Sequence, residues 1–185
     1  MRPREGSEKT PRMELSADAT LAFPRPIVFR TYRDDLVKLV EFLPNIRRIE
    51  VKTRTDDGAK TEMVNEWHGG GEIPAAARAV LSENMLSWTD YASWDADDWT
   101  CAWRIETHSF TEAVRCLGKN RFVEVDGGTR LEIRGSLAID GTKLKAVPRL
   151  LSKTVAKAVE DLLVKKITPN LLSVSDGLRK YLERK

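Results

Sequence analysis

The chain has 185 residues, of which 41% are hydrophobic and 32% are charged, and its formal net charge is +3. This length suits one domain with a sizeable core, and the composition excludes a disordered or fibrous protein. No stretch approaches the roughly 18 uninterrupted apolar residues that a membrane-spanning helix needs, and the first residues lack the apolar core of a signal peptide. The sequence therefore predicts a cytoplasmic protein.

The amino-terminal third of the chain predicts a leader, a strand and a helical segment. Residues 1–12 are polar, contain two prolines and show no periodicity, which predicts a disordered leader before a single domain at 13–185. Residues 13–23 alternate between apolar and polar side chains, as a half-buried strand does. Two prolines end that strand, and apolar residues at spacings of three and four then predict one or two short helices within 27–43.

Six further strands are predicted in the middle of the chain. Residues 46–56 and 59–68 alternate on either side of Asp57-Gly58, a strong hairpin signal. The stretch 69–85 interrupts the alternation with three glycines and an alanine-rich turn, and we expect it to act as a hinge that crosses a sheet edge. Four more strands follow at 86–94, 99–110, 116–125 and 129–140.

The last part of the chain has the period of a long helix. From residue 146 one face is broadly apolar, and the opposite face carries Arg149, Lys153 and Lys157. Thr168-Pro169 is typical of a kink or of a capped restart, after which the apolar pattern continues towards the carboxyl terminus.

This order of elements predicts an α+β domain with an internal cavity. The helix and the sheet each have one apolar face, so they must bury each other. A seven-stranded sheet twists and curls, and a single helix laid across it rarely fills the space beneath. An apolar cavity between the helix and the sheet follows.

The order resembles that of the START-like superfamily, also called SRPBCC or Bet v 1-like. In this helix-grip fold a seven-stranded curved antiparallel sheet wraps around a long carboxy-terminal helix, with two short helices between strands 1 and 2. The segment EIPAAARAVL at 72–81, before a strand that ends in Trp94, is similar to a bacterial subfamily of unknown function. The resemblance implies binding of lipids, sterols, polyketides or other apolar molecules, in some members with cyclase or dehydratase chemistry.

Strand alternation indicates which side chains face the cavity. Aromatic residues there could form a ligand wall or fill the core. Asn65 and Asp90 are polar residues on an apolar face, which is costly without a partner, so each needs a ligand hydroxyl, a water or a structural hydrogen bond. The predicted ligand-binding residues are Asn65, Trp67, Trp88, Asp90, Trp103, Ile133, Leu151 and Val155.

Three functions are compatible with these features. The first is a non-enzymatic carrier or sensor of an apolar or amphipathic small molecule. The second is an enzyme of the polyketide cyclase or dehydratase type, in which Asp90 acts as general acid or base and Asn65 orients a carbonyl. The third is a protein-interaction module with a solidly packed core. The first is preferred, because no second polarising group can be placed beside Asp90.

Other motifs indicate no cofactor and no metal. His68 and His108 lack metal-binding spacing and a nucleophile to activate, so we expect them to be surface residues. Cys101 and Cys116 are expected to be ordinary strand thiols. The triple glycine lacks the residues of a phosphate loop. The basic face at 149–157 predicts either peripheral contact with an anionic membrane or a solvated surface, and no motif for nucleic-acid recognition is present.

Overall fold

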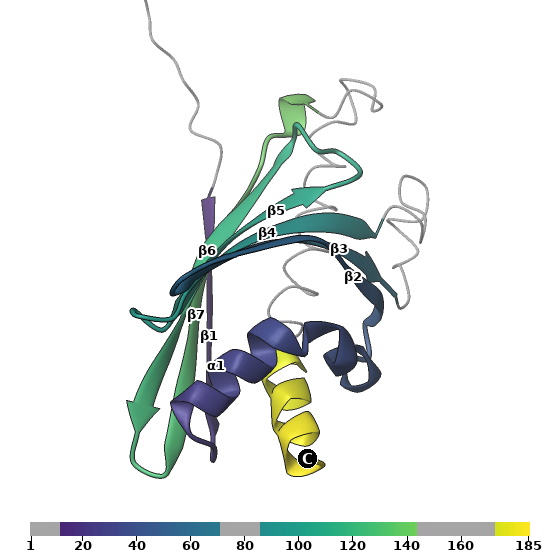
Figure 1. Cartoon of the computed structure of the whole chain (residues 1–185). Helices are drawn as coiled ribbons and strands as arrows, with labels where there is room; N and C mark the ends of the chain where they lie inside the picture. The colour runs from purple at the N-terminus through teal and green to yellow at the C-terminus, as the bar shows by residue number, and fades with distance from the viewer. Residues whose placement is uncertain (1–11, 71–85, 144–172) are drawn as a thin grey trace, which may run out of the picture.

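The computed structural model describes residues 12–70, 86–143 and 173–185, and its main element is one curved antiparallel sheet (Figure 1). The sheet has seven strands in the order β1-β7-β6-β5-β4-β3-β2, so β1 and β2 are its edges. All seven predicted strands are present. Their bounds are β1 Arg12–Leu21, β2 Ile46–Asp57, β3 Lys60–Gly69, β4 Ser87–Asp95, β5 Thr100–Thr107, β6 Val114–Val125 and β7 Gly128–Ile139.

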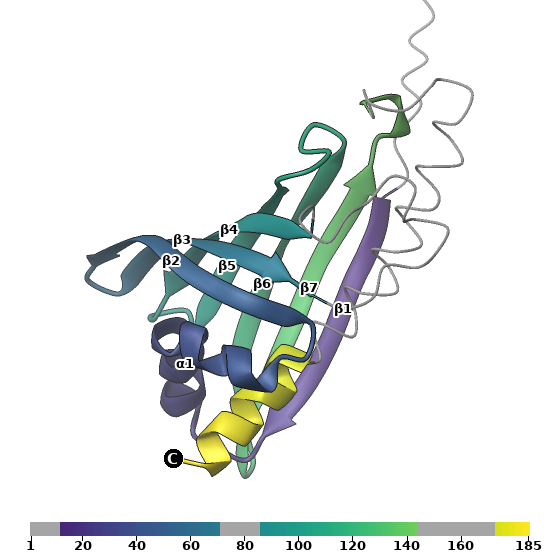
Figure 2. The ribbon, with the colours of Figure 1, turned by 90° about the vertical axis from the view of Figure 1, so that its right-hand side faces the viewer.

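Helices lie on the concave side of this sheet. α1 (Arg25–Asp34) and the 3-10 helix η1 (Leu36–Phe42) connect β1 to β2, which confirms two short helices there. The carboxy-terminal helix, described over residues 173–183, runs beside them (Figure 2). A short 3-10 turn, η3 (Gly141–Lys143), follows β7. Residues 1–11 of the predicted leader (1–12), residues 71–85 of the predicted hinge segment (69–85) and residues 146–172 of the predicted helix lie outside the described residues. Arg12 belongs to β1 and Gly69 to β3, so the predicted leader and hinge segment each overlap a strand.

Two glycines lie in tight turns between neighbouring strands, and the sequence predicts the first of these turns as a hairpin. Gly58 between β2 and β3 has φ +59°, and Gly127 between β6 and β7 has φ +76°. Side chains with a Cβ atom rarely adopt this left-handed conformation, so the two glycines set where the hairpins reverse. The register of β2 on β3 also shifts at Ile46/Arg48 and at Val51/Thr53, and such irregularities bend a strand.

The main core joins the sheet to the three helices. Phe29 of α1 is 1% exposed and meets the rings of Trp94, Trp99 and Phe122 edge-on. Val174, Leu178 and Leu182 of the carboxy-terminal helix belong to the same cluster. A second cluster lies at the other end of the sheet, and Trp103 packs against both. Its buried members are Leu15, Val114, Cys116, Leu137 and Ile139.

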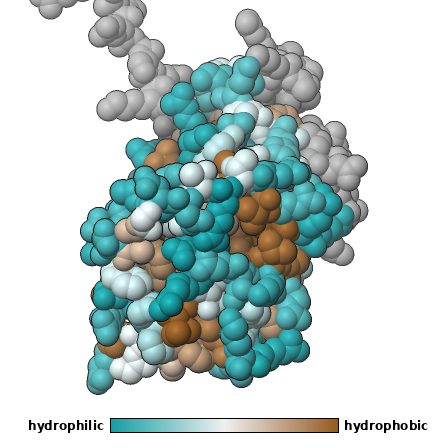
Figure 3. Space-filling view, in the orientation of Figure 1, coloured by the Kyte–Doolittle hydropathy of each residue, from teal (hydrophilic) through white to brown (hydrophobic). Residues whose placement is uncertain are grey.

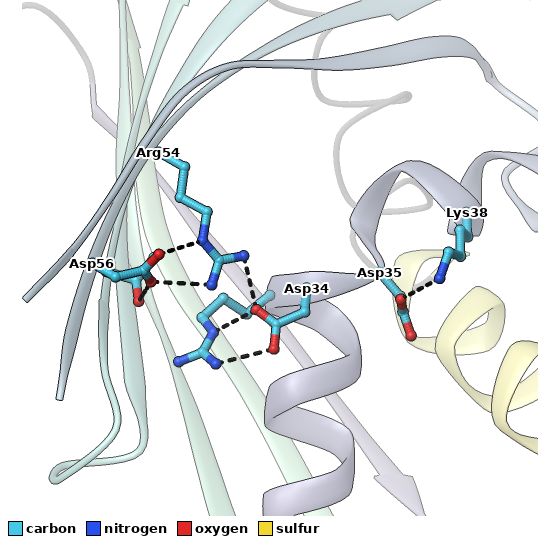
Figure 4. Close-up of polar contacts among 7 residues, drawn as sticks. Asp34, Asp35, Lys38, Arg54 and Asp56 are labelled. Carbon is cyan, nitrogen blue, oxygen red and sulfur yellow. Dashed lines mark hydrogen bonds and ion pairs between the residues drawn. The ribbon is translucent and has the colours of Figure 1, made fainter. Parts of the chain in front are cut away.

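Ion pairs tie the end of α1 to β2 (Figure 4). Arg54 of β2 donates two hydrogen bonds to Asp56, at 2.9 and 3.0 Å, and also lies 2.9 Å from Asp34 at the end of α1. Asp34 accepts a further pair of hydrogen bonds from Arg33. These groups are partly exposed, and ion pairs of this kind contribute little to stability. We therefore expect them to position α1 more than to stabilise it.

Asp35 connects the α1–η1 junction to the carboxy-terminal helix. Its carboxylate accepts hydrogen bonds from Lys38 Nζ at 2.7 Å, Lys185 Nζ at 3.0 Å and Tyr181 Oη at 3.1 Å. Burial alone would raise the pKa of Asp35, but the bonds from Lys38, Lys185 and Tyr181 lower it to about 2. Because the folded-state pKa is below the ordinary value, this group stabilises the fold above about pH 4 and loses that contribution as the pH falls towards 2.

We expect the substitution Asp35→Asn to lower the free energy of unfolding at pH 7 by about 1 to 2 kcal/mol, after allowance for the exposed lysines. The amide keeps the shape of the carboxylate but loses its charge. Urea denaturation at pH 7 measures the loss, with Asp97→Asn, an exposed position in the β4–β5 turn, as the matched control. Equal stability of the two variants would contradict the role given to Asp35.

Candidate functional site

A polar pair lies on the concave face of the sheet. Asn65 of β3 and Asp90 of β4 are direct cross-strand neighbours, and Asn65 Nδ2 donates a hydrogen bond to Asp90 Oδ2 at 3.2 Å. Both share the face of the buried core residues Met63 and Trp94, as strand alternation predicts. The two polar residues expected to face inward are therefore in contact.

Asp90 is deep in the protein but is not closed off from solvent. Burial raises its pKa to about 6, and the side chains of Asn65 and Trp67 oppose that shift. Asp90 nevertheless keeps some solvent-accessible surface, as do Trp88 and Trp103 on the same face. A small molecule that approached this face would meet a carboxyl group that titrates near neutral pH.

Several buried polar atoms around this pair have no hydrogen-bond partner in the described part of the chain. They are Asn65 Oδ1, Trp67 Nε1, Trp94 Nε1 and Thr107 Oγ1 on the concave face, together with Arg25 Nε. Asn65 is 1% exposed and Trp67 is 7% exposed. An unpaired buried polar group costs about 1 to 3 kcal/mol, so a cluster of them on one face calls for a partner.

Aromatic rings flank the pair. Trp67 of β3 and Trp88 of β4 are direct cross-strand neighbours, and their rings stack with centroids 5.8 Å apart and an interplanar angle of 15°. Each lies two residues from Asn65 or Asp90 on its own strand, on the same face of the sheet. Four of the predicted ligand-binding residues are therefore adjacent.

The position of Trp103 depends on two glycines. A Cβ atom at Gly118 would lie 2.3 Å from Trp103 Cζ2, and one at Gly135 would lie 2.7 Å from Trp103 Cη2, so the indole lies flat across both strands. Its Nε1 donates to Asn120 Oδ1 at 2.9 Å. Trp103 consequently faces the space between the two hydrophobic clusters, although its polar atom already has a partner.

Sequence reasoning missed two polar residues of this face. Asn120 is 3% exposed and occupies an inward position of β6, which the alternation of that strand could have revealed. Tyr32 of α1 counted only as an apolar helical residue. Burial raises the pKa of its hydroxyl, and the nearby Cys101 and Asp90 add to that effect. Its proximity to Asp90 depends on how α1 packs, and no sequence pattern gives that.

Of the remaining predicted ligand-binding residues, the structure describes Ile133, which is not beside Asp90. Ile133 is 1% exposed and lies on β7, three strands away from β4, directly opposite Asn120. Leu151 and Val155 lie outside the described residues, as do the basic side chains of Arg149, Lys153 and Lys157.

One group of metal-binding residue types lies on the other face of the sheet. Donor atoms of Glu50, Glu66 and His68 lie within 4.8 Å of one another. Lys52 Nζ is 2.8 Å from Glu50 and 3.1 Å from Glu66, so a cation of the protein already neutralises these carboxylates. We therefore assign no metal to this group.

The two cysteines are buried and free, as the sequence predicts. Burial raises the pKa of Cys101 well above its ordinary value and that of Cys116 to about 12. Both remain thiols at neutral pH, which makes them poor nucleophiles.

No protein-family model matches the chain, and no curated protein matches it. Solved structures do. An aromatase/cyclase from Streptomyces sp. R1128 superposes with a TM-score of 0.65 at 15% identity, covering 94% of this chain and 95% of that one. The chain has the helix-grip fold. Norcoclaurine synthase from Thalictrum flavum has a TM-score of 0.62 at 13% identity, covering 95% of this chain and 89% of that one.

A third similar structure is a protein from Thermus thermophilus, with a TM-score of 0.62 at 18% identity and coverage of 91% of this chain and 95% of that one. These likenesses confirm the START-like fold that the sequence resembles, and at such identities they establish the fold alone.

In the described residues, no helix has the length and apolar character needed to cross a membrane. Hydrophobic side chains form small groups on the otherwise hydrophilic surface seen in Figure 3.

Proposed function

We propose that the protein binds an apolar small molecule in a cavity against the concave face of its sheet, with the polar group of that molecule at Asn65 and Asp90. The observation that carries this proposal is a set of polar atoms on an aromatic face that have no partner within 12–70, 86–143 and 173–185, beside a carboxyl group that solvent still reaches. A ligand or ordered water would supply the missing hydrogen bonds.

A solidly packed interaction module accounts for these features less well. A packed core would be expected to exclude solvent from Trp88, Asp90 and Trp103, and all three keep accessible surface. It would also leave Asn65 Oδ1 unpaired at a position that an aliphatic residue could occupy without cost.

An enzyme of the cyclase or dehydratase type is the second candidate. A carboxyl group with a pKa of about 6 can both take up and release a proton near neutral pH, which suits a general acid or base. One of the similar structures is an aromatase/cyclase. If the protein is such an enzyme, Asp90→Asn should abolish turnover and leave ligand affinity almost unchanged, whereas in a carrier it should change affinity alone.

The proposal predicts that a bulky side chain on the concave face blocks binding. Ile105 of β5 is partly exposed and is the cross-strand neighbour of Asp90, so Ile105→Trp places an indole over the polar pair. We expect at least about a tenfold loss of affinity, which corresponds to about 1.4 kcal/mol. Titration with the neutral dye N-phenyl-1-naphthylamine, followed by displacement with fatty acids, sterols and aromatic polyketides, measures the effect.

Leu117→Trp is the matched control, because Leu117 lies on the neighbouring strand β6, faces outward and is 47% exposed. It should leave affinity within about twofold of the wild type, as expected for an exposed position away from special features. Equal affinities of the two variants would place the dye elsewhere on the surface, and no binding by the wild type would contradict the proposal itself.

A further inference from the structure

Among the residues that the structure describes, Asp90 has no counter-charge. In the described part of the chain, the groups that act on its pKa besides burial are the amide of Asn65 and the indole of Trp67, both uncharged. Most other carboxylates that the structure describes near the protein surface lie beside a lysine or an arginine, as Asp18 and Asp95 do. A buried carboxylate is ordinarily paired with a cation, so Asp90 differs from most other described carboxylates in having no cation beside it in that part of the chain.

The hydrogen-bonding positions of Asn65 and Asp90 that have no partner among the described residues are acceptors. An ionised carboxylate offers about four lone-pair positions, and the amide of Asn65 uses one of them at 3.2 Å. Asn65 Oδ1, on a residue that is 1% exposed, is a second acceptor, and it has no partner among the described residues. A ligand group that matches them must donate several hydrogen bonds.

The neighbouring rings also favour positive charge. The faces of indole rings carry negative electrostatic potential and attract ammonium groups. Trp67 and Trp88 are cross-strand neighbours, and their rings stack on each other. On this face of the sheet they form the next residue pair after Asn65 and Asp90. The carboxylate of Asp90, the amide oxygen of Asn65 and the two indole rings therefore all favour a positively charged ligand group.

We propose that the ligand is an apolar amine, whose protonated nitrogen donates hydrogen bonds to Asp90 and Asn65 Oδ1 beside the stacked rings of Trp67 and Trp88. The inference rests on the proposed function and names its ligand class. An ammonium group supplies the missing positive charge and up to three donors, whereas a hydroxyl supplies one donor and no charge. A fatty-acid carboxylate at this position would be repelled by Asp90.

Three naphthalene compounds of similar size test the inference: 2-(1-naphthyl)ethylamine, 2-(1-naphthyl)ethanol and 1-naphthylacetic acid, titrated into the full chain by calorimetry at pH 7.5. We expect the amine to bind at least about tenfold more tightly than the alcohol, since charge-assisted hydrogen bonds are about twice as strong as neutral ones. The acid should bind most weakly. Asp90→Asn should remove the preference for the amine and leave the affinity for the alcohol within about twofold.

The pH dependence provides a second readout. The pKa of Asp90 is about 6, so lowering the pH from 7.5 to 5 should weaken binding of the amine and leave binding of the alcohol unchanged. The other titratable groups that sense its charge in the described structure are Tyr32 of α1, Cys101 of β5 and Cys116 of β6. Their pKa values are all raised, so they remain uncharged in this range.

The outcomes separate this inference from the proposed function. If the alcohol binds as tightly as the amine, or if Asp90→Asn keeps the preference for the amine, the inference is wrong while the cavity proposal stands. If none of the three compounds binds and N-phenyl-1-naphthylamine does not bind either, both are wrong. The variant is tested for folding by circular dichroism, and the wild-type comparison of amine with alcohol remains decisive if the variant fails to fold.

Discussion

Replacement of Phe29 by alanine is expected to lower the free energy of unfolding by about 3 to 5 kcal/mol, as is typical when a buried aromatic side chain is removed from a core. Phe29 is 1% exposed, and its ring centroid lies 5.3 Å from that of Trp94, 5.3 Å from that of Trp99 and 5.1 Å from that of Phe122. Through this ring α1 contacts β4, β6 and the β4–β5 turn, and Tyr32 of α1 adds ring contacts to Trp94 and Phe122. Urea denaturation followed by far-ultraviolet circular dichroism measures the loss.

Ile27→Ala is the matched control for this prediction. Ile27 lies two residues earlier on α1 but is 43% exposed, so its truncation should cost less than about 1 kcal/mol. A loss below about 2 kcal/mol for Phe29→Ala, or similar losses for the two variants, would mean that α1 is not anchored by this ring.

Asp90→Asn is expected to stabilise the protein at neutral pH. The pKa of Asp90 is about 6 in the folded protein against an ordinary value of 3.8, chiefly because of burial. For an acid with a raised folded-state pKa, the unfolded chain loses its proton first, so stability falls as the pH rises from about 4 through about 6. A shift of about two units corresponds to roughly 3 kcal/mol, at about 1.36 kcal/mol per unit, and an uncharged asparagine avoids this loss.

The sign of this effect can be checked at two pH values. The gain from Asp90→Asn should approach roughly 3 kcal/mol at pH 7.5 and be smaller by about 1 kcal/mol at pH 5, where the folded wild type already holds the proton. Asp126→Asn, at an exposed turn between β6 and β7, is the matched control and should change stability at pH 7.5 by less than about 0.5 kcal/mol. A destabilised Asp90→Asn variant at pH 7.5 would indicate that a cation faces Asp90 in solution.

Much of the sheet could be predicted from the sequence, because a sheet with one buried face gives each strand a period of two. The turns at Gly58 and Gly127 could also be predicted locally. Both residues adopt positive φ, a conformation that glycine takes more readily than other residues. The end of β5 was predicted too late. Phe110 continues the apolar pattern and packs against the second cluster, but its φ of 58° places it in a turn after Thr107, where β5 ends.

The site could be predicted in part. Strand alternation indicated that Asn65 and Asp90 face inward. It could not show that they lie opposite each other, because that depends on the register between β3 and β4. A two-residue turn fixes register, as Gly58-Ala59 does between β2 and β3, whereas β3 and β4 are separated by a long segment that sets no register from its sequence. The contribution of Tyr32 depends on helix packing in the same way.

The central claim is that the concave face holds a small molecule, and native mass spectrometry of the purified protein tests it most directly. The mass under native conditions is compared with the denatured mass, and any released compound is extracted into organic solvent and identified. The account predicts an additional mass from an apolar compound that is present in the wild type and reduced in Ile105→Trp. A native mass equal to that of the chain, together with no response of the five tryptophans to apolar amines, fatty acids, sterols or aromatic polyketides, would contradict it.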